Sequence, residues 1–166
     1  SPDVKCGVPV NAAGWGSFSH VAKFGDNVAH NLSDDKHRYI AAVEAQSYAP
    51  YVKCPVLMLC ALRDEGFDGD RAYDTYSRIG NPEDNALVYS SNSGACIGPN
   101  GLTDMDLFLE KNLKGREIYI PDTLNVSLKE TEEGLQVDVE CDKEGILEES
   151  GVFYAEADVK TKSAYR

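Results

Sequence analysis

The sequence lacks a long apolar run, because no stretch approaches the roughly eighteen consecutive apolar residues that a membrane-spanning helix needs. Its N-terminus also lacks a charged segment followed by an apolar one, which is the pattern of a secretory signal. Basic residues are few, 16 against 28 acidic ones, and the formal net charge is −12. Such a surface repels phosphate backbones and anionic lipid headgroups, so neither nucleic acid nor a membrane is an expected partner.

The cysteines form no C-x-x-C pair. They are odd in number and scattered, at Cys6, Cys54, Cys60, Cys96 and Cys141. This set predicts neither a zinc site nor a disulfide framework, and it favours a reducing, cytoplasmic compartment. Cys54 and Cys60 lie in or beside an apolar run, where a thiol is usually a small buried apolar group. The chain starts with Ser-Pro-Asp instead of methionine, which indicates a processed or shortened chain.

Up to Gly115 the sequence alternates apolar runs with helical patterns. The runs at 4–10 (V-K-C-G-V-P-V), 55–62 (P-V-L-M-L-C-A-L) and 86–90 (A-L-V-Y-S) are mostly or wholly apolar. Parallel strands covered by helices on both faces have this composition, because neither face meets water. We therefore expect about three parallel strands in this part of the chain.

Helices are predicted between and after these strands, at 33–48, 71–79 and 103–114. The first has Ser33 as a plausible N-cap and an apolar face, and the third starts with a capping box and has an apolar stripe. The residues concerned are Tyr39, Ala42 and Val43 for the first, Ala72, Tyr76 and Ile79 for the second, and Thr103, Met105, Asp106, Phe108 and Leu109 for the third. Gly115 is the expected C-terminal stop.

Beyond Gly115 the apolar spacing changes to strict alternation. The alternating runs lie at 118–120, 124–128, 135–141 and 152–159, with a turn at 132–134. Alternation predicts antiparallel strands with one face in water. The sequence thus predicts an α/β fold class, half of a mostly parallel sheet followed by a small antiparallel β module at 116–166. About four strands are too few for a complete β-sandwich, which has about seven.

Several of these segments together resemble the second half of an α/β-hydrolase domain. They are Y-A-P-Y-V-K-C-P-V-L-M-L-C-A-L-R-D (48–64), the helix after it, A-L-V-Y-S-S with its loop, and D-M-D-L-F-L-E-K-N-L-K-G (104–115). The resemblance is to the branch of acetyl-xylan-esterase-like, dienelactone-hydrolase-like and prolyl-peptidase-like proteins, some of which carry a small β module after the last helix. It is good over 4–115 and weak over 116–166. It implies a half-domain at 1–115 with a helical insertion at 17–50.

Such enzymes use a serine in a G-x-S-x-G turn, an acid after a later strand and a histidine after the last strand. The resemblance implies that Asp64 is the acid, with Asp68 as the second choice, and that Ala95 stands in the histidine position. His20, His30 and His37 all precede the acid. No G-x-S-x-G occurs in the chain.

The resemblance therefore implies a serine esterase-like or peptidase-like hydrolase that is inactive by itself, because the nucleophile and the histidine are absent. The alternative is a non-catalytic binding or assembly protein that keeps the hydrolase fold. The expected partner is the N-terminal half of the same protein, or a second copy, covering an exposed edge of the sheet. A small ester or peptide is the expected substrate only of a completed protein.

Other chemistries fit the sequence less well, and neither a metal nor a cofactor is predicted. The acidic loop at 64–70 is rich in oxygen ligands, but it lacks the D-x-[DN]-x-[DN]-G spacing of a calcium loop. Cys96 has no histidine near it in the sequence that would activate a thiol. The G-W-G-S stretch at 14–17 lacks the glycine and lysine pattern that holds phosphate.

Overall fold

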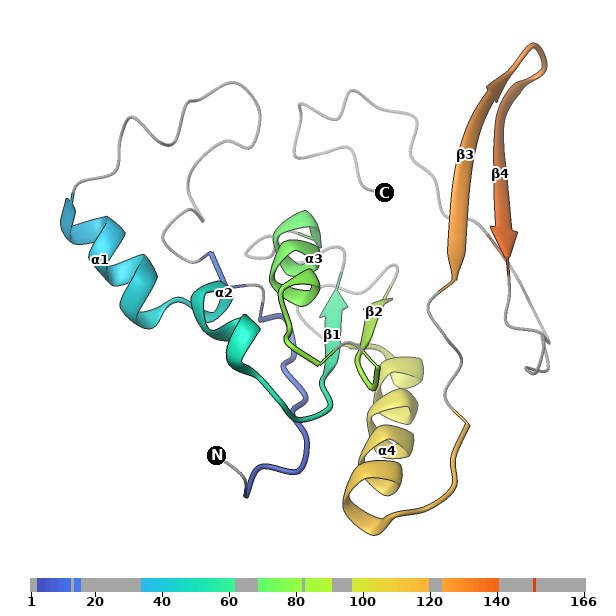
Figure 1. Ribbon diagram of the computed structural model, residues 1–166. Coiled ribbons are helices and arrows are strands. Elements are labelled where there is room, and N and C mark those ends of the chain that lie inside the picture. The colour runs from blue at the N-terminus through green and yellow to red at the C-terminus, as the bar shows by residue number, and fades with distance from the viewer. Residues whose placement is uncertain are drawn as a thin grey trace.

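A computed structural model describes residues 3–12, 14–15, 34–61, 69–81, 83–90, 97–119, 124–140 and 151. These residues form a mixed α/β arrangement with a two-stranded parallel sheet and a separate two-stranded antiparallel sheet (Figure 1). The elements in chain order are α1 (Asp34–Val43), α2 (Ala45–Tyr48), the 3-10 helix η3 (Ala49–Tyr51), β1 (Leu57–Ala61), α3 (Gly69–Ser77), β2 (Ala86–Ser90), α4 (Pro99–Lys114), β3 (Asn125–Thr131) and β4 (Gly134–Glu140). Within these ranges no helix has the length and apolar character needed to cross a membrane.

Strand β1 is the centre of the parallel part, and every one of its residues is buried. On one face, Met58 and Cys60 pack with Ala72 of α3. On the other face, Leu57 and Leu59 pack with Phe108 of α4. The two helices thus cover opposite faces of β1, which explains why its sequence is apolar at successive positions and does not alternate.

A third stretch of chain, residues 7–11, runs parallel to β1 on the edge opposite β2. The amides of Gly7 and Asn11 donate to Pro55 O and Leu59 O, at 2.9 and 2.8 Å, and Gly7 O and Pro9 O accept from Leu57 and Leu59. In a regular ladder the amide of residue 9 would also donate to β1, but Pro9 has no N–H. The stretch therefore forms two isolated bridges, Gly7 to Val56 and Val10 to Leu59, in place of the expected third strand.

The predicted helix at 33–48 is two helices in the structure. Glu44 has extended backbone angles, φ −70° and ψ 137°, and separates α1 from α2. The expected apolar face of Tyr39, Ala42 and Val43 is exposed, and Ile40 is half-buried. This apolar face does not pack against the sheet, because the main chain turns at Glu44 and α2, with its buried Gln46, makes the contact with α3.

The helix predicted from Thr103 starts one turn earlier, at Pro99, so the capping-box prediction was wrong. Gly98 is the N-cap and Pro99 takes the first helical position, where its missing N–H costs no hydrogen bond. Thr103 is inside α4, and its hydroxyl donates to Pro99 O at 3.2 Å. The C-terminal stop is confirmed, because Gly115 has the left-handed φ of 65° that favours glycine.

The antiparallel pair β3–β4 forms a hairpin around a turn at Glu132 and Glu133, as predicted, and projects away from the parallel strands (Figure 1). The expectation of one buried face was wrong for the described residues. The register places five apolar side chains on one face, and four of them, Val126, Leu128, Leu135 and Val139, are 43 to 67% exposed. The expected strand at 118–120 is absent at Ile118 and Tyr119, and the strand predicted at 152–159 lies outside the described residues.

Candidate functional site at the carboxyl edge of the parallel strands

The carboxyl ends of β1 and β2 lie next to each other, which is where open α/β sheets hold their chemistry. Ala61 and Ser90, the last residues of the two strands, are register partners. The segments that follow them are therefore attached at neighbouring points of one sheet edge. Asp64 and Asp68 belong to the first segment and Ala95 to the second, and all three lie outside the described residues.

The residues at the starts of α3 and α4, which follow these two segments, lie close to β2. The hydroxyl of Tyr89 in β2 donates to Gly69 O, at the start of α3, at 2.6 Å. Gly101 of α4 is buried, and a Cβ atom there would lie 3.1 Å from the Ile97 side chain and 3.4 Å from Ser90 Oγ. Helices α3 and α4 thus begin close to the ends of the strands, so both segments are fixed at both ends.

Asn11 ends the hydrogen-bonded edge between residues 7–11 and β1. Its backbone has a left-handed φ of 47°, which turns the chain away from the sheet. Its side-chain Oδ1 accepts the Ala61 amide at 2.7 Å, the donor that the next main-chain carbonyl of a regular ladder would have bound. Asparagine combines both properties, because it tolerates the left-handed region and its short amide group replaces a backbone group.

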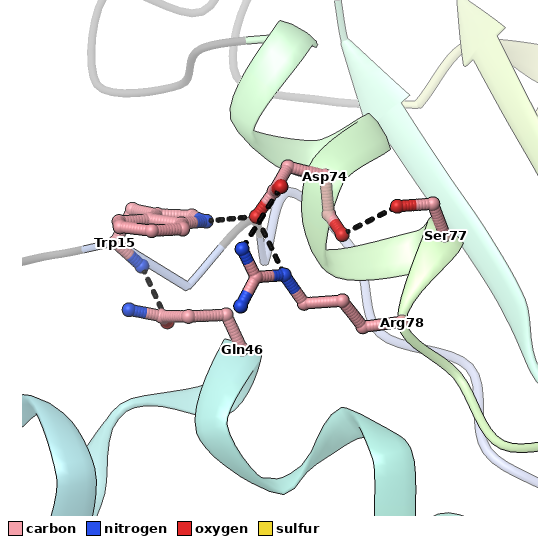
Figure 2. A network of polar contacts seen from close by, with 5 residues as sticks. All are labelled: Trp15, Gln46, Asp74, Ser77 and Arg78. Atoms are coloured by element: carbon pink, nitrogen blue, oxygen red, sulfur yellow. Dashed lines mark hydrogen bonds and ion pairs between the residues drawn. The ribbon is translucent and has the colours of Figure 1, made fainter.

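Trp15, the single tryptophan of the chain, is held by two helices soon after this turn (Figure 2). Its backbone N–H donates to Gln46 Oε1 of α2 at 2.9 Å, and its indole Nε1 donates to Asp74 Oδ2 of α3 at 3.0 Å. Arg78 binds both oxygens of Asp74, at 2.9 and 3.1 Å, and its guanidinium lies 5.4 Å from the centre of the indole ring. A cation over an aromatic face at this distance is attractive. We call Trp15, Gln46, Asp74 and Arg78 the tryptophan clamp.

The tryptophan clamp leaves no room beside Gly14. Gly14 has a left-handed φ of 65°, and a Cβ atom there would lie 2.5 Å from Gln46 Oε1 and 3.2 Å from the backbone nitrogen of Gln46. Gln46 itself is buried, and its Nε2 has no hydrogen-bond partner among the described residues. The close approach of the chain to α2 therefore depends on glycine at position 14, and it sets the direction in which the chain leaves the carboxyl edge.

Burial raises the pKa of two of the described thiols, Cys6 and Cys60. Burial raises the pKa of Cys60 to about 12, so it stays protonated at neutral pH, as expected for a thiol in the core. Burial, and to a smaller extent the charge of Cys54, also raise the pKa of Cys6. The neighbouring Tyr89 hydroxyl has its pKa raised to about 12, first by burial and then by Cys60, Asp70 and Tyr73. Cys96 lies outside the described residues.

No histidine of the described part of the chain lies at the carboxyl edge. His37 is on the exposed helix α1, and His20 and His30 lie outside the described residues. Within the described ranges, no three His, Cys, Asp or Glu side chains are grouped so that they could hold a metal ion. At this edge the Asn11 side chain holds the backbone by accepting the Ala61 amide, and the tryptophan clamp holds the chain a few residues further on against α2 and α3.

Sequence reasoning found the strand ends but missed the residues that hold them. Trp15 and Asp74 are 59 residues apart, and Asn11 and Ala61 are 50 apart, so no local pattern connects them. One local signal was present, because asparagine directly after an apolar run often adopts the left-handed turn seen at Asn11. Neither a protein-family model, nor a curated protein, nor a solved structure matches the chain.

Proposed function

We propose that the chain is the C-terminal half of an α/β-hydrolase-like protein whose catalytic triad is incomplete. One observation supports this best: residues 7–11, β1 and β2 run parallel in sequence order, with α3 on one face of β1 and α4 on the other. Such a half-sheet would place the triad acid after β1 and the histidine after β2. Asp64 and Ala95 occupy these two places in the sequence, on segments whose first ends are the paired residues Ala61 and Ser90.

The proposal implies that the purified chain does not turn over short-chain acyl esters. Serine needs a neutral imidazole to take its proton, and the combined loss of nucleophile and histidine removes about 10⁶-fold of rate. A stopped assay with a chromogenic acetate ester should therefore give the buffer rate. Turnover above that rate that disappears in Asp64→Ala would contradict the proposed absence of a working triad.

The placement of Asp64 and Ala95 is tested by restoring the imidazole. In Ala95→His, a neighbouring Asp64 carboxylate should favour the charged imidazolium and raise the pKa of the introduced imidazole by about one unit or more above its usual value of about 6.5. The pKa is measured by NMR titration of the imidazole protons, with the parent chain identifying the signals of the three native histidines.

The matched control is the double variant Ala95→His with Asp64→Asn, which keeps the shape of residue 64 and removes its charge. The pKa of the introduced imidazole should return to the usual value in this variant. An unshifted pKa in the single variant, unchanged by Asp64→Asn, would show that the two positions do not face each other, and the hydrolase alignment would be wrong.

A second candidate function, binding or assembly through the sheet edge, is favoured by the orientation of Pro9. Because the amides of Gly7 and Asn11 face β1, alternation along the strand directs the N–H groups of Cys6, Val8 and Val10 away from it. Edge strands that avoid pairing often place the missing N–H of proline on the outside. Pro9 instead faces β1, so the outer edge keeps its donors and can pair with a strand of the N-terminal half or of a second copy.

Association through this edge is expected in solution. Sedimentation velocity at about 50 µM, where an interface of micromolar affinity is largely formed, should show a dimer of the isolated chain. Val10→Pro removes an outward donor and should weaken the dimer, whereas Val10→Ala shortens the same side chain, keeps the donor and should not. A well-folded monomer, or equal effects of the two variants, would argue against pairing at this edge.

A further inference from the structure

The fold brings two cysteines together that are far apart in the sequence. Cys6 precedes Gly7, which bridges to Val56, and Cys54 lies two residues before Val56. The Gly7 amide donates to Pro55 O at 2.9 Å, so the chain around Cys6 is hydrogen-bonded to the residue directly after Cys54. Both cysteines are free thiols and both are partly exposed, in contrast to the buried Cys60.

The separation expected from this register suits a disulfide. Residues paired across strands are about 4.8 Å apart, and a shift of one residue adds about 3.3 Å along the strand, so the two Cα atoms should be about 6 Å apart. Native disulfides most often join Cα atoms at about 5.5–6 Å. The chain bends at Cys54, so the direction of this side chain is not fixed by the alternation of β1. Cys54 belongs to neither core cluster, whereas Cys6 packs, partly buried, against the cluster of Leu57, Leu59 and Phe108.

The electrostatics of the pair agree with this geometry. After burial, the second cause that raises the pKa of Cys6 is the charge of Cys54. Two thiolates that influence each other in this way lie within short electrostatic range. A thiolate at Cys54 therefore adds to the effect of burial on the pKa of Cys6, and removing that charge removes the smaller of the two causes.

We propose that Cys6 and Cys54 form a redox-sensitive dithiol site, which glutathione disulfide oxidises to an intramolecular disulfide. The Cys54 thiolate attacks one sulfur of glutathione disulfide and releases one glutathione thiolate, leaving a mixed disulfide. The Cys6 thiolate then attacks the Cys54 sulfur and releases the second glutathione. Two cysteine thiols are oxidised, one glutathione disulfide is reduced to two glutathiones, and the two thiol protons end on the glutathione thiolates.

The disulfide would fasten the start of residues 7–11 to the start of β1. It closes a loop over residues 7 to 53, which is 53 − 6 = 47 residues. Closing a loop of this length restricts the unfolded chain and so favours the folded one. Oxidation would then hold the start of this parallel stretch beside β1, three residues before the ladder hydrogen bond that Pro9 omits, and reduction would remove this link. The site does not depend on the proposed hydrolase-like function.

The test uses the whole chain in glutathione buffers that range from fully reduced to fully oxidised. Free thiols are then alkylated with iodoacetamide and the peptides are analysed by mass spectrometry. A peptide pair linked through Cys6 and Cys54 should accumulate under oxidising conditions, with Cys60 remaining reduced because it is buried and its pKa is raised to about 12. The melting temperature of the oxidised chain should be about 5 °C or more above that of the reduced chain.

Cys54→Ser is the matched variant, because it keeps a small polar side chain and removes one sulfur. It should eliminate both the linked peptide and the rise in melting temperature, and its reduced form should melt close to the reduced parent. Three results would each overturn the proposal: both thiols remain alkylated at every buffer ratio, Cys6 or Cys54 links to another cysteine instead, or the link joins two chains. The parent chain alone decides these outcomes, so a variant that fails to fold does not leave the proposal untested.

Discussion

Replacing Leu59 by alanine should lower the free energy of unfolding by about 3–5 kcal/mol. Leu59 is fully buried, lies in the middle of the central strand and packs with Phe108. The substitution removes the transfer free energy of the lost carbon atoms and leaves a cavity between β1 and α4 that the surrounding helix and strands fill only partly. Urea unfolding followed by circular dichroism measures the change.

Leu128→Ala is the matched control for this prediction. It makes the same chemical change in a strand, but Leu128 is 63% exposed on the hairpin. Its cost should stay within about 0.5 kcal/mol, as for other surface positions. Equal losses of stability at the two positions would show that Leu128 is buried as fully as Leu59, and would contradict the exposure of the hairpin's apolar face.

Gly14→Ala should cost about 2–4 kcal/mol, which is more than the same change at Gly115. Both glycines have a φ of 65°, so a Cβ atom meets the same left-handed backbone penalty of about 1–2 kcal/mol at each. Around Gly115 nothing lies within 4 Å of the added atom, whereas at Gly14 it would lie 2.5 Å from Gln46 Oε1. The difference between the two variants therefore measures the contacts with α2, at Gln46 and at the Ala45 Cβ, which would lie 3.3 Å away.

The tryptophan clamp also gives this prediction an optical signal. Trp15 is the single tryptophan, and its amide donates to the same Gln46 oxygen that the new methyl group would displace. The emission maximum of Gly14→Ala should shift, because the indole leaves Asp74 and Arg78, whereas Gly115→Ala should keep the parent spectrum. Equal losses of stability with unchanged spectra would contradict the close packing of residue 14 against α2.

Local signals in the sequence identified the elements of the parallel part. The apolar run A-L-V-Y-S corresponds residue by residue to β2, and β1 occupies five of the eight residues predicted for it. Gly115 ended its helix as expected because a left-handed C-terminal residue has a strong local preference for glycine. The start of that helix is not evident in the sequence, because its N-cap, Gly98, contributes no side-chain hydrogen bond, whereas Thr103 has the residue type of a cap.

Features that depend on distant partners could not be predicted in the same way. The spacing of Tyr39 and Val43 shows that they share a helix face, but not that the chain turns at Glu44 and leaves that face exposed. The apolar run at 4–10 predicts a third strand, but only the hydrogen-bond register shows two isolated bridges there and the nitrogen of Pro9 pointing toward β1. Asp64 and Ala95 come from a resemblance and remain predictions.

The missing amide at Pro9 has a consequence for how the sheet opens. Joining residues 7–11 to β1 closes a loop of about 48 residues, against about 29 for β1 and β2, which adds a few tenths of a kcal/mol of chain entropy. The absent hydrogen bond removes about 1 kcal/mol more from the same contact. The stretch at 7–11, which is joined to β1 by two isolated bridges, is therefore expected to leave the sheet first in a partial unfolding event. When it leaves, the carbonyls and amides on this edge of β1 are unpaired. The same stretch of a second copy can then bind to that edge by domain swapping.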